Sequence, residues 1–134
     1  MGAHVAHEMI KVMARKGIHV GRARGLVMGL AFKENCPDIR NTRVTDVIAA
    51  LDEYGVTVDV VDPWVNTDEA RNEYGLELVS DPKPDVYDGL VVAVAHKEFR
   101  ALSAEALRAP LKDVAVIYDV KSMLPAGAED VVRL

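Results

Sequence analysis

Residues 25–63 read GLVMGLAFKENCPDIRNTRVTDVIAALDEYGVTVDVVDP and contain the pattern that decides the fold. The run 25–32 is apolar and has the length of a strand, which predicts a strand buried on both faces. Apolar residues at helical spacing over 44–51 predict an amphipathic helix. Residues 56–63 alternate in polarity and end at a proline, which predicts a second strand. The stretch therefore predicts a β-α-β unit with a crossover of ordinary length.

The ends of this central helix are marked in the sequence. Asn41 and Thr42 precede it, and either residue can cap a helix N-terminus, while Gly55 closes it. A second helical period runs over 1–15 and stops at Gly17. The other expected elements are a polar helix at 68–73, a short strand at 76–79, an apolar strand at 89–96, a helix at 103–108, a strand at 114–120 and an edge strand at 130–134. This alternation predicts an α/β domain with a mostly parallel sheet covered on both faces.

Composition limits the class of function. A chain of 134 residues can bury one core, and 50% hydrophobic with 28% charged residues argues against disorder. The net charge of -5 disfavours a nucleic-acid partner and leaves a small phosphorylated ligand open. The single cysteine excludes a disulfide framework and fits a reducing compartment. Because no apolar run has membrane-spanning length and no signal peptide opens the chain, we expect a cytoplasmic protein with no membrane partner.

Ligands of open parallel sheets bind beyond the carboxyl ends of the strands, so the residues that follow each strand are the candidates. A dinucleotide site needs G-x-G-x-x-G after the first strand, but only Gly29 is present there. Positive side chains must then supply the charge. Lys33 and Arg40 flank a proline turn and can hold a diphosphate together with the following helix N-terminus. Phe32 can stack on a base.

Three further strand-end residues each have a functional and a structural interpretation. Lys121 follows a buried strand, where it either contacts a ligand or begins a turn. Asp62 stands where dinucleotide folds carry the acid that binds a ribose, but it also precedes a proline in a turn. His96 either bonds a ligand or satisfies the end of its strand.

Other reactive residues fit structural roles better. His4 and His7 are spaced i,i+3 without a third ligand, so we expect a solvated face and no metal site. Cys36 has no evident base beside it, which argues against a nucleophile. Trp64 can cover a ligand, although ordinary loop packing explains it as well.

Several segments together resemble one known family. GLAFKENCPDIRNTRVTDVIAAL, VTVDVVDPW, VVAVAHKEF and YDVK resemble the C-terminal, nucleotide-binding domain of the UDP-glucose/GDP-mannose dehydrogenase family. The resemblance covers nearly the whole chain, and its N-C-P-D loop looks closest to the UDP-N-acetylhexosamine branch that serves surface polysaccharides. It implies a Rossmann-like three-layer sandwich preceded by the end of a long central helix. Residues 1–20 would be the end of that dimerising helix, and residues 21–134 the domain that binds the UDP-sugar.

The resemblance also implies a function and a division of labour. Family members oxidise the C6 alcohol of a nucleotide sugar to a carboxylate in two NAD-dependent steps. An N-terminal domain holds NAD, and a middle region carries the catalytic cysteine and forms the dimer. The resemblance assigns nucleotide contacts to Phe32, Lys33, Arg40 and Lys121. Because the fragment would lack the NAD-binding and catalytic parts, we expect it to be inactive alone.

Two other classes of function compete with this interpretation. A phospho-receiver signalling domain also has a lysine after its last parallel strand, but it needs a pair of acids after the first strand, where Phe32 and Lys33 stand. A dimerisation module with an empty sheet edge would pair through the first helix and bind no nucleotide. Titration with nucleotides separates these alternatives.

Overall fold

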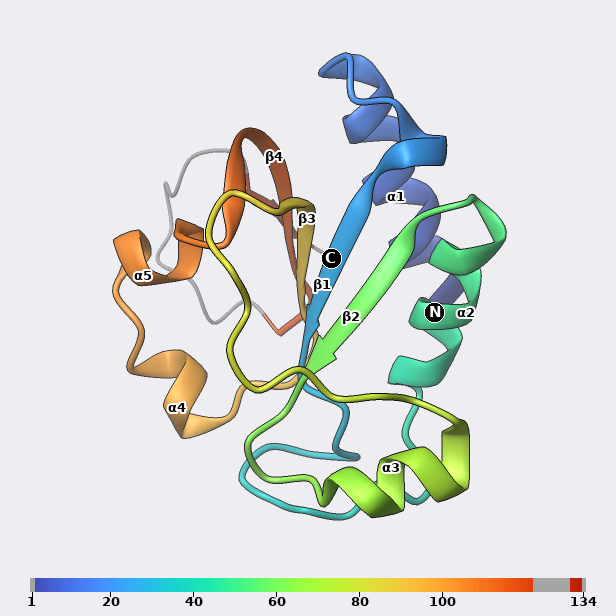
Figure 1. Cartoon of the computed structure of the whole chain (residues 1–134), viewed down its shortest axis with the longest axis vertical. Coiled ribbons are helices and arrows are strands. Elements are labelled where there is room, and N and C mark those ends of the chain that lie inside the picture. The colour runs from blue at the N-terminus through green and yellow to red at the C-terminus, as the bar shows by residue number, and fades with distance from the viewer. Residues whose placement is uncertain (1, 122–130, 134) are drawn as a thin grey trace.

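The computed structural model describes residues 2–121 and 131–133 (Figure 1). Its helices and turns are α1 (Gly2–Arg15), the short 3-10 turn η1 (Val20–Arg22), α2 (Val44–Glu53), α3 (Thr67–Tyr74), α4 (Lys97–Arg100) and α5 (Ala104–Arg108). Its strands are β1 (Arg24–Met28), β2 (Thr57–Val61), β3 (Tyr87–Val92), β4 (Leu111–Asp119) and β5 (Val131–Arg133).

The strands form one sheet in the order β2-β1-β3-β4-β5, and every pair in it is parallel. Helices α1 and α2 lie on one side of the sheet, and α4 and α5 lie on the other (Figure 1). The α/β prediction of a parallel sheet between two helical layers is confirmed. All carboxyl ends of the strands point the same way, so the loops that follow them gather at one end of the molecule.

Both faces of the central strands β1 and β3 are buried, as the apolar runs predict. Val27 of β1 and Val91 of β3 join the core beneath α1 and α2. Their neighbours Leu26 and Leu90 point to the opposite face and join a second core with Phe99 of α4. Successive side chains of a strand alternate between faces, so a strand with helices on both sides must be apolar throughout.

Helix α1 belongs to the same core as the sheet. Val5, Ala6, Met9 and Met13 are completely buried and recur at the spacing of one helix face. That face packs against α2, β3 and β4. The division at residue 20 and the dimerising role of residues 1–20 stay predictions.

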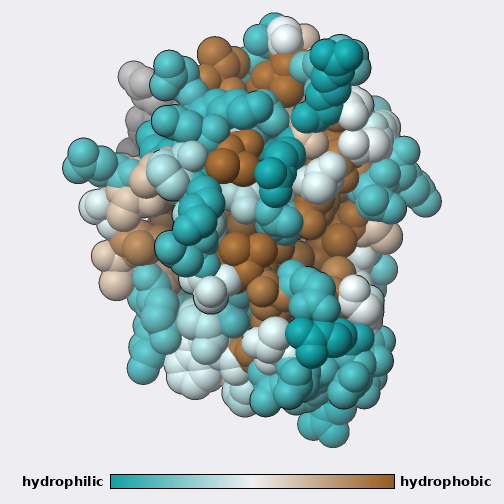
Figure 2. Space-filling model, viewed as in Figure 1, coloured by the Kyte–Doolittle hydropathy of each residue, from teal (hydrophilic) through white to brown (hydrophobic). Residues whose placement is uncertain are grey.

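The surface around these cores is mixed. Figure 2 shows apolar side chains in a band over the middle of the viewed face, with hydrophilic residues around them. Its lower end, where Figure 1 places α3, is hydrophilic, and in α3 only Ala70 is buried. No helix of the described residues is long and apolar enough to cross a membrane.

Several predicted boundaries differ from the structure for local reasons. The first strand ends at Met28 rather than at 32, because Gly29 has a φ of +104° and turns the backbone out of the sheet. The strand expected at 76–79 is reduced to a single bridge between Leu78 and Val60. Helix α4 was not predicted, since four residues are too few to show a helical period.

The predicted cap of α2 is confirmed for the Thr42 side chain, although the assigned N-cap position is one residue later. Arg43 occupies the N-cap position, and its side chain makes no capping hydrogen bond. The Thr42 hydroxyl instead accepts a hydrogen bond from the backbone N–H of Val44 at 3.2 Å. The edge strand predicted at 130–134 is present as β5 over Val131–Arg133.

Candidate ligand-binding site

A pocket of about 470 Å³ opens at the carboxyl ends of β1, β3 and β4. The chain runs from β1 to β2 on one side and later enters β3 on the other side of β1, so the strand order reverses here. Such a switch point is where open α/β sheets bind ligands. The walls come from the β1–α2 loop, the ends of α1 and α2, the segment after β3, α4 and the end of β4. The lining residues are Gly2, Val5, Ala31, Phe32, Lys33, Glu34, Asn41, Thr42, Arg43, Val44, Val47, Ala93, Val94, Ala95, Arg100, Val120 and Lys121.

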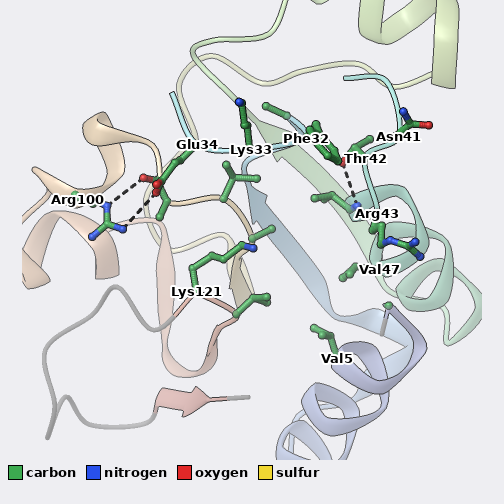
Figure 3. A pocket seen from close by; sticks show the side chains of 17 residues that line it. Val5, Phe32, Lys33, Glu34, Asn41, Thr42, Arg43, Val47, Arg100 and Lys121 are labelled. Carbon is green, nitrogen blue, oxygen red and sulfur yellow. Dashed lines mark hydrogen bonds and ion pairs between the residues drawn. The ribbon is translucent and has the colours of Figure 1, made fainter. Parts of the chain in front are cut away.

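Four cationic side chains line this pocket: Lys33, Arg43, Arg100 and Lys121. Lys121 reaches toward the middle of the space, whereas Lys33 points away from it along the outer side of its loop (Figure 3). Within the described residues, neither lysine nor Arg43 forms an ion pair with a carboxylate. The positive charge of the pocket is therefore largely available to a ligand.

Arg100 is the cation with internal partners. Its Nε donates to the carbonyl oxygen of Ala95 at 3.1 Å, and its Nη2 lies 3.4 Å from the Glu34 carboxylate. Figure 3 shows this pair at one wall of the pocket, between the β1–α2 loop and α4. Both side chains are more than half exposed, so the ion pair is weak and an anionic ligand can compete for Arg100.

Phe32 lies at the pocket with 55% of its surface exposed. Its backbone N–H donates to the carbonyl oxygen of Asp38 at 2.7 Å, which fixes the start of the loop while leaving the ring outside the core. An exposed ring costs hydrophobic stabilisation that a stacked ligand can restore. The exposed ring at the pocket leaves room for a base, and the role of Phe32 stays a prediction.

Arg40 does not line the pocket. Its Nε and Nη2 donate to the two carboxylate oxygens of Asp38, each at 3.1 Å, and its side chain is 83% exposed. The hydrogen bonds from Arg40 hold the pKa of Asp38 below its ordinary value. Sequence reasoning treated the planar fork as free, but a carboxylate two residues away already accepts it.

Asp62 and His96 also lie outside the pocket lining, and both side chains are completely buried. Asp62 Oδ2 accepts hydrogen bonds from the backbone N–H groups of Leu30 and Ala31, and His96 Nε2 lies 2.9 Å from the same oxygen. The geometry therefore favours the structural interpretation of both residues over a direct contact with a ribose or another ligand.

The loop after β1 does not fit a dinucleotide. In a dinucleotide site, backbone N–H groups after the first strand point at the pyrophosphate. Here the N–H groups of Leu30 and Ala31 donate to Asp62, and that of Phe32 donates to Asp38. Because these donors are already engaged, NAD has no backbone cradle at β1, and side chains must hold any anion.

Sequence reasoning missed two of the lining cations. Arg43 precedes the ten-residue helix α2, and Arg100 ends α4, so neither follows a strand directly. Arg43 could have been found, because it directly precedes a predicted helix that begins at the carboxyl end of the strands, where ligands bind. For Arg100 there was no comparable signal, because α4 itself is too short to predict.

The remaining candidates have local roles. Among the described residues, no group of three metal-ligating side chains comes together, and His7 Nδ1 lies 3.4 Å from the Tyr54 hydroxyl. Trp64 donates its indole N–H to Glu98 at 2.8 Å, which lowers the pKa of that carboxyl. The ammonium group of Lys97 stands 5.3 Å from the centroid of the Trp64 ring. Trp64 thus packs over the loop outside the pocket lining.

The comparisons with known proteins agree with this architecture. Residues 26–126 match the family model described as UDP-glucose/GDP-mannose dehydrogenase family, UDP binding domain. The chain is 48% identical over 130 residues to a UDP-N-acetyl-D-glucosamine 6-dehydrogenase of Pseudomonas aeruginosa, covering 97% of this chain and 31% of that protein. A protein of the same name from Salmonella typhi is 47% identical, with 98% and 31% covered.

Solved structures share the fold. An NDP-N-acetyl-D-galactosaminuronic acid dehydrogenase from Methanosarcina mazei Go1 superposes with a TM-score of 0.81 at 25% identity, covering 99% of this chain and 28% of that one. A UDP-D-ManNAc dehydrogenase from Pyrococcus horikoshii gives 0.78 at 18% identity, covering 98% and 29%. The chain thus spans about a third of the length of its relatives. These matches confirm the resemblance and its branch, and none supports a phospho-receiver domain.

Proposed function

Because this chain belongs to the UDP-glucose/GDP-mannose dehydrogenase family, we propose that it binds the UDP part of a UDP-N-acetylhexosamine within an NAD-dependent 6-dehydrogenase. The complete enzyme would oxidise the C6 alcohol of the sugar to a carboxylate. This chain would hold the nucleotide, while regions outside it would hold NAD and the catalytic cysteine. The curated relatives are about three times as long as the matched region, which leaves room for those parts.

The observation that carries the proposal is a set of cations at the switch point of the sheet. Lys121 and Arg43 line the pocket without an ion pair to any described carboxylate, and Lys33 stands on its rim. A UDP diphosphate carries two adjacent negative charges, and lysine and arginine bind such groups by charge-assisted hydrogen bonds. The N-terminal end of α2 adds a partial positive charge at Val44, which also lines the pocket.

The base would stack on Phe32. The exposed ring lies beside Lys33 in the sequence, so a base on the ring and a phosphate near the lysine are compatible with one extended nucleotide. Arg40 has a smaller part in this proposal than the sequence alone indicated, because Asp38 holds its guanidinium outside the pocket. Arg100 would exchange Glu34 for phosphate or sugar oxygens when the ligand enters.

The experiment that tests this function is calorimetric titration of the chain with UDP, GDP and NAD at low ionic strength, where charge-assisted binding is screened least. We expect UDP to bind more tightly than both GDP and NAD. Equal affinity for all of them, or none for UDP, would contradict the proposal. A dimer without nucleotide affinity would instead support the dimerisation module.

The chain alone would not catalyse the oxidation. We expect no NADH to form when it is mixed with UDP-N-acetylglucosamine and NAD, because the proposed division of labour assigns hydride transfer and the thiolate to other regions. NADH absorbance measures this directly, and clear turnover would overturn that division. We further propose a cytoplasmic enzyme that dimerises through the helix that includes α1, which light scattering of the complete protein tests.

A further inference from the structure

The loop that carries Phe32 and Lys33 is anchored from beneath by a buried pair of polar residues. Asp62 follows β2, and His96 lies between β3 and α4, so the two come from opposite sides of β1. Neither side chain has exposed surface, and His96 Nε2 lies 2.9 Å from Asp62 Oδ2. A buried polar pair costs desolvation and persists where its hydrogen bonds are satisfied.

The hydrogen bonds of this pair reach the loop on both sides of Phe32 and Lys33. On the N-terminal side, Asp62 Oδ2 accepts from the N–H of Leu30 at 2.7 Å and of Ala31 at 3.0 Å. On the C-terminal side, the N–H of Asn35 donates to His96 Nδ1 at 2.9 Å. Because Nδ1 accepts, it carries no proton, and Nε2 is the donor to Asp62. One continuous network therefore fixes both ends of the segment 32–34.

Neighbouring contacts hold the pair itself in place. The other Asp62 oxygen, Oδ1, accepts from the N–H of Trp64 at 2.8 Å, so both of its oxygens are engaged. The His96 ring lies between Trp64, with centroids 6.0 Å apart, and Phe99, at 5.4 Å. The Asn35 side chain adds a further tie, because its Oδ1 accepts from the Lys97 N–H at 2.8 Å.

We propose that Asp62 and His96 are positioning residues for nucleotide binding, which act by holding Phe32 and Lys33 at the pocket without touching the ligand. The inference rests on the proposed function, since it names how this chain prepares its UDP contacts. Asn35 has a φ of +54°, a left-handed conformation that asparagine adopts more readily than other side-chain-bearing residues, and its hydrogen bonds to His96 and Lys97 fix the loop in it. A loop ordered in advance binds more tightly because binding then costs less conformational entropy.

Three substitutions at His96 separate its two hydrogen bonds. His96→Gln can place an amide near the former Nε2 and keep the bond to Asp62, while it releases Asn35. His96→Asn can keep the acceptor for Asn35 and release Asp62. His96→Phe removes both and keeps a ring between Trp64 and Phe99. We expect UDP affinity to fall about tenfold for the first two variants and further for the third. Affinity is measured at a temperature well below the melting temperature of each variant, so that every variant is folded.

A double-mutant cycle distinguishes positioning from a general loss of stability. If His96 acts through the loop, His96→Gln weakens UDP much less in a Lys33→Ala background than in the original chain. In a Lys121→Ala background the effect of His96→Gln stays complete, because Lys121 follows β4 and is not held by this network. A purely structural role gives the same loss in both backgrounds.

Asn35→Gly tests the same network with a variant that we expect to fold even if the His96 variants do not. Asn35 is exposed, and glycine suits its positive φ, so the change removes only the tie to Lys97 N–H. We expect a two- to fivefold weaker affinity, on the order of the loss of one neutral hydrogen bond, with an almost unchanged melting temperature. Amide hydrogen exchange gives a readout without ligand: exchange at residues 30, 31 and 35 should accelerate in the His96 variants.

Each outcome bears on a different statement. Weaker UDP binding in the His96 variants, non-additive with Lys33→Ala, supports the positioning role. Unchanged affinity and unchanged exchange at 30, 31 and 35 overturn it while the proposed function stands. If the original chain binds no UDP at all, the proposed function fails, and the exchange data alone then decide whether the pair orders the loop.

Discussion

The two ends of the parallel sheet differ in how their lysines are paired, although both ends contain ion pairs of arginine. At the amino end, Arg24 of β1 pairs with Asp59 of β2 at 2.9 Å, and Lys112 of β4 lies 3.3 Å from Asp88. At the carboxyl end, Lys33 and Lys121 have no such pair within the described residues. The paired cations link neighbouring strands, whereas the unpaired lysines are the ones that we propose contact an anion. The difference separates what stabilises this fold from what the fold can bind.

Aspartate carboxylates accept backbone N–H groups at both ends of the sheet, but with different consequences. At the carboxyl end, the N–H groups after β1 are taken by Asp62, so the site offers cationic side chains rather than a glycine-rich cradle. At the amino end, the Arg24 N–H donates to Asp88 at 2.9 Å, which ties β1 to β3. Substitutions at the amino end should therefore change mainly stability, and substitutions of the pocket lysines mainly ligand affinity.

The largest expected effect is on stability at Gly29, where the carboxyl end turns. A Cβ added there would stand 2.5 Å from Val94 Cβ, in a backbone with a φ of +104°. Strain and overpacking together should lower the free energy of unfolding of Gly29→Ala by about 3 kcal/mol or more. Gly75→Ala is the matched control, because its φ is also positive but nothing lies within 4 Å. Urea denaturation measures both, and equal losses would contradict the close contact.

The next effect is on affinity at the carboxyl end. Lys33→Ala and Lys121→Ala should each weaken UDP by about tenfold to a hundredfold, since a charge-assisted hydrogen bond contributes about 1.5–3 kcal/mol. Uridine, which has no phosphates, should lose little. Lys112→Ala removes a lysine from the amino end and should leave UDP affinity unchanged. Calorimetry on the same ligand batch compares them, and similar losses for UDP and uridine would count against a phosphate contact.

A smaller effect is expected on stability at the amino end. Asp59 accepts hydrogen bonds from Arg24 Nη2 at 2.9 Å and from the Tyr87 hydroxyl. Asp59→Asn removes the charge that both donors face and should destabilise the fold by about 1–2 kcal/mol without changing UDP affinity. The exposed Asp113→Asn on β4 serves as the control for loss of one negative charge. A changed UDP affinity in the Asp59 variant would contradict the claim that the amino end of the sheet affects only stability.

The effect confined to the narrowest conditions is a pH dependence of stability at the same end. Burial, and then the hydrogen bond to Asp59, raise the pKa of Tyr87 from 10.0 to about 12. The unfolded chain therefore loses this proton first, so stability should fall as the pH rises from about 10 toward 12, by at most about 1.4 kcal/mol per pH unit. Tyr87→Phe should make that decline shallower and leave the trend below pH 9 unchanged. Denaturation curves at several alkaline pH values test it, and an equal decline in both proteins would refute it.

Much of the fold could be predicted because its signals are local and repeated. Apolar runs of strand length predicted β1, β3 and β4, and topology then predicted that Lys33 and Lys121 follow strands at one edge. The path of the β1–α2 loop could not be predicted in this way, because hydrogen bonds to residues far along the chain determine it. Arg40 shows the consequence: its spacing suits a diphosphate, but Asp38 turns it outward.

For Asp62 and His96, the sequence predicted the position but not the direction of the side chain. Their positions after strands predicted the correct edge of the sheet, yet the sequence does not tell whether a side chain there faces the ligand or the loop. Their burial follows from three backbone donors in the loop that need acceptors, namely those of Leu30, Ala31 and Asn35. Arg43 is the N-cap residue of α2 and Arg100 ends α4, so neither directly follows a strand, and the pattern of strand ends does not reveal them.

The central claim is that a uridine nucleotide binds at the carboxyl ends of β1, β3 and β4. Titration of the isotopically labelled chain with UDP, followed by amide chemical shifts, tests it most directly. We predict that the largest shifts fall on residues 31–34, 42–45, 93–95 and 120–121, with little change at Arg24, Asp59 and Lys112. Shifts concentrated at the amino end of the sheet, or none at saturating UDP, would contradict the account.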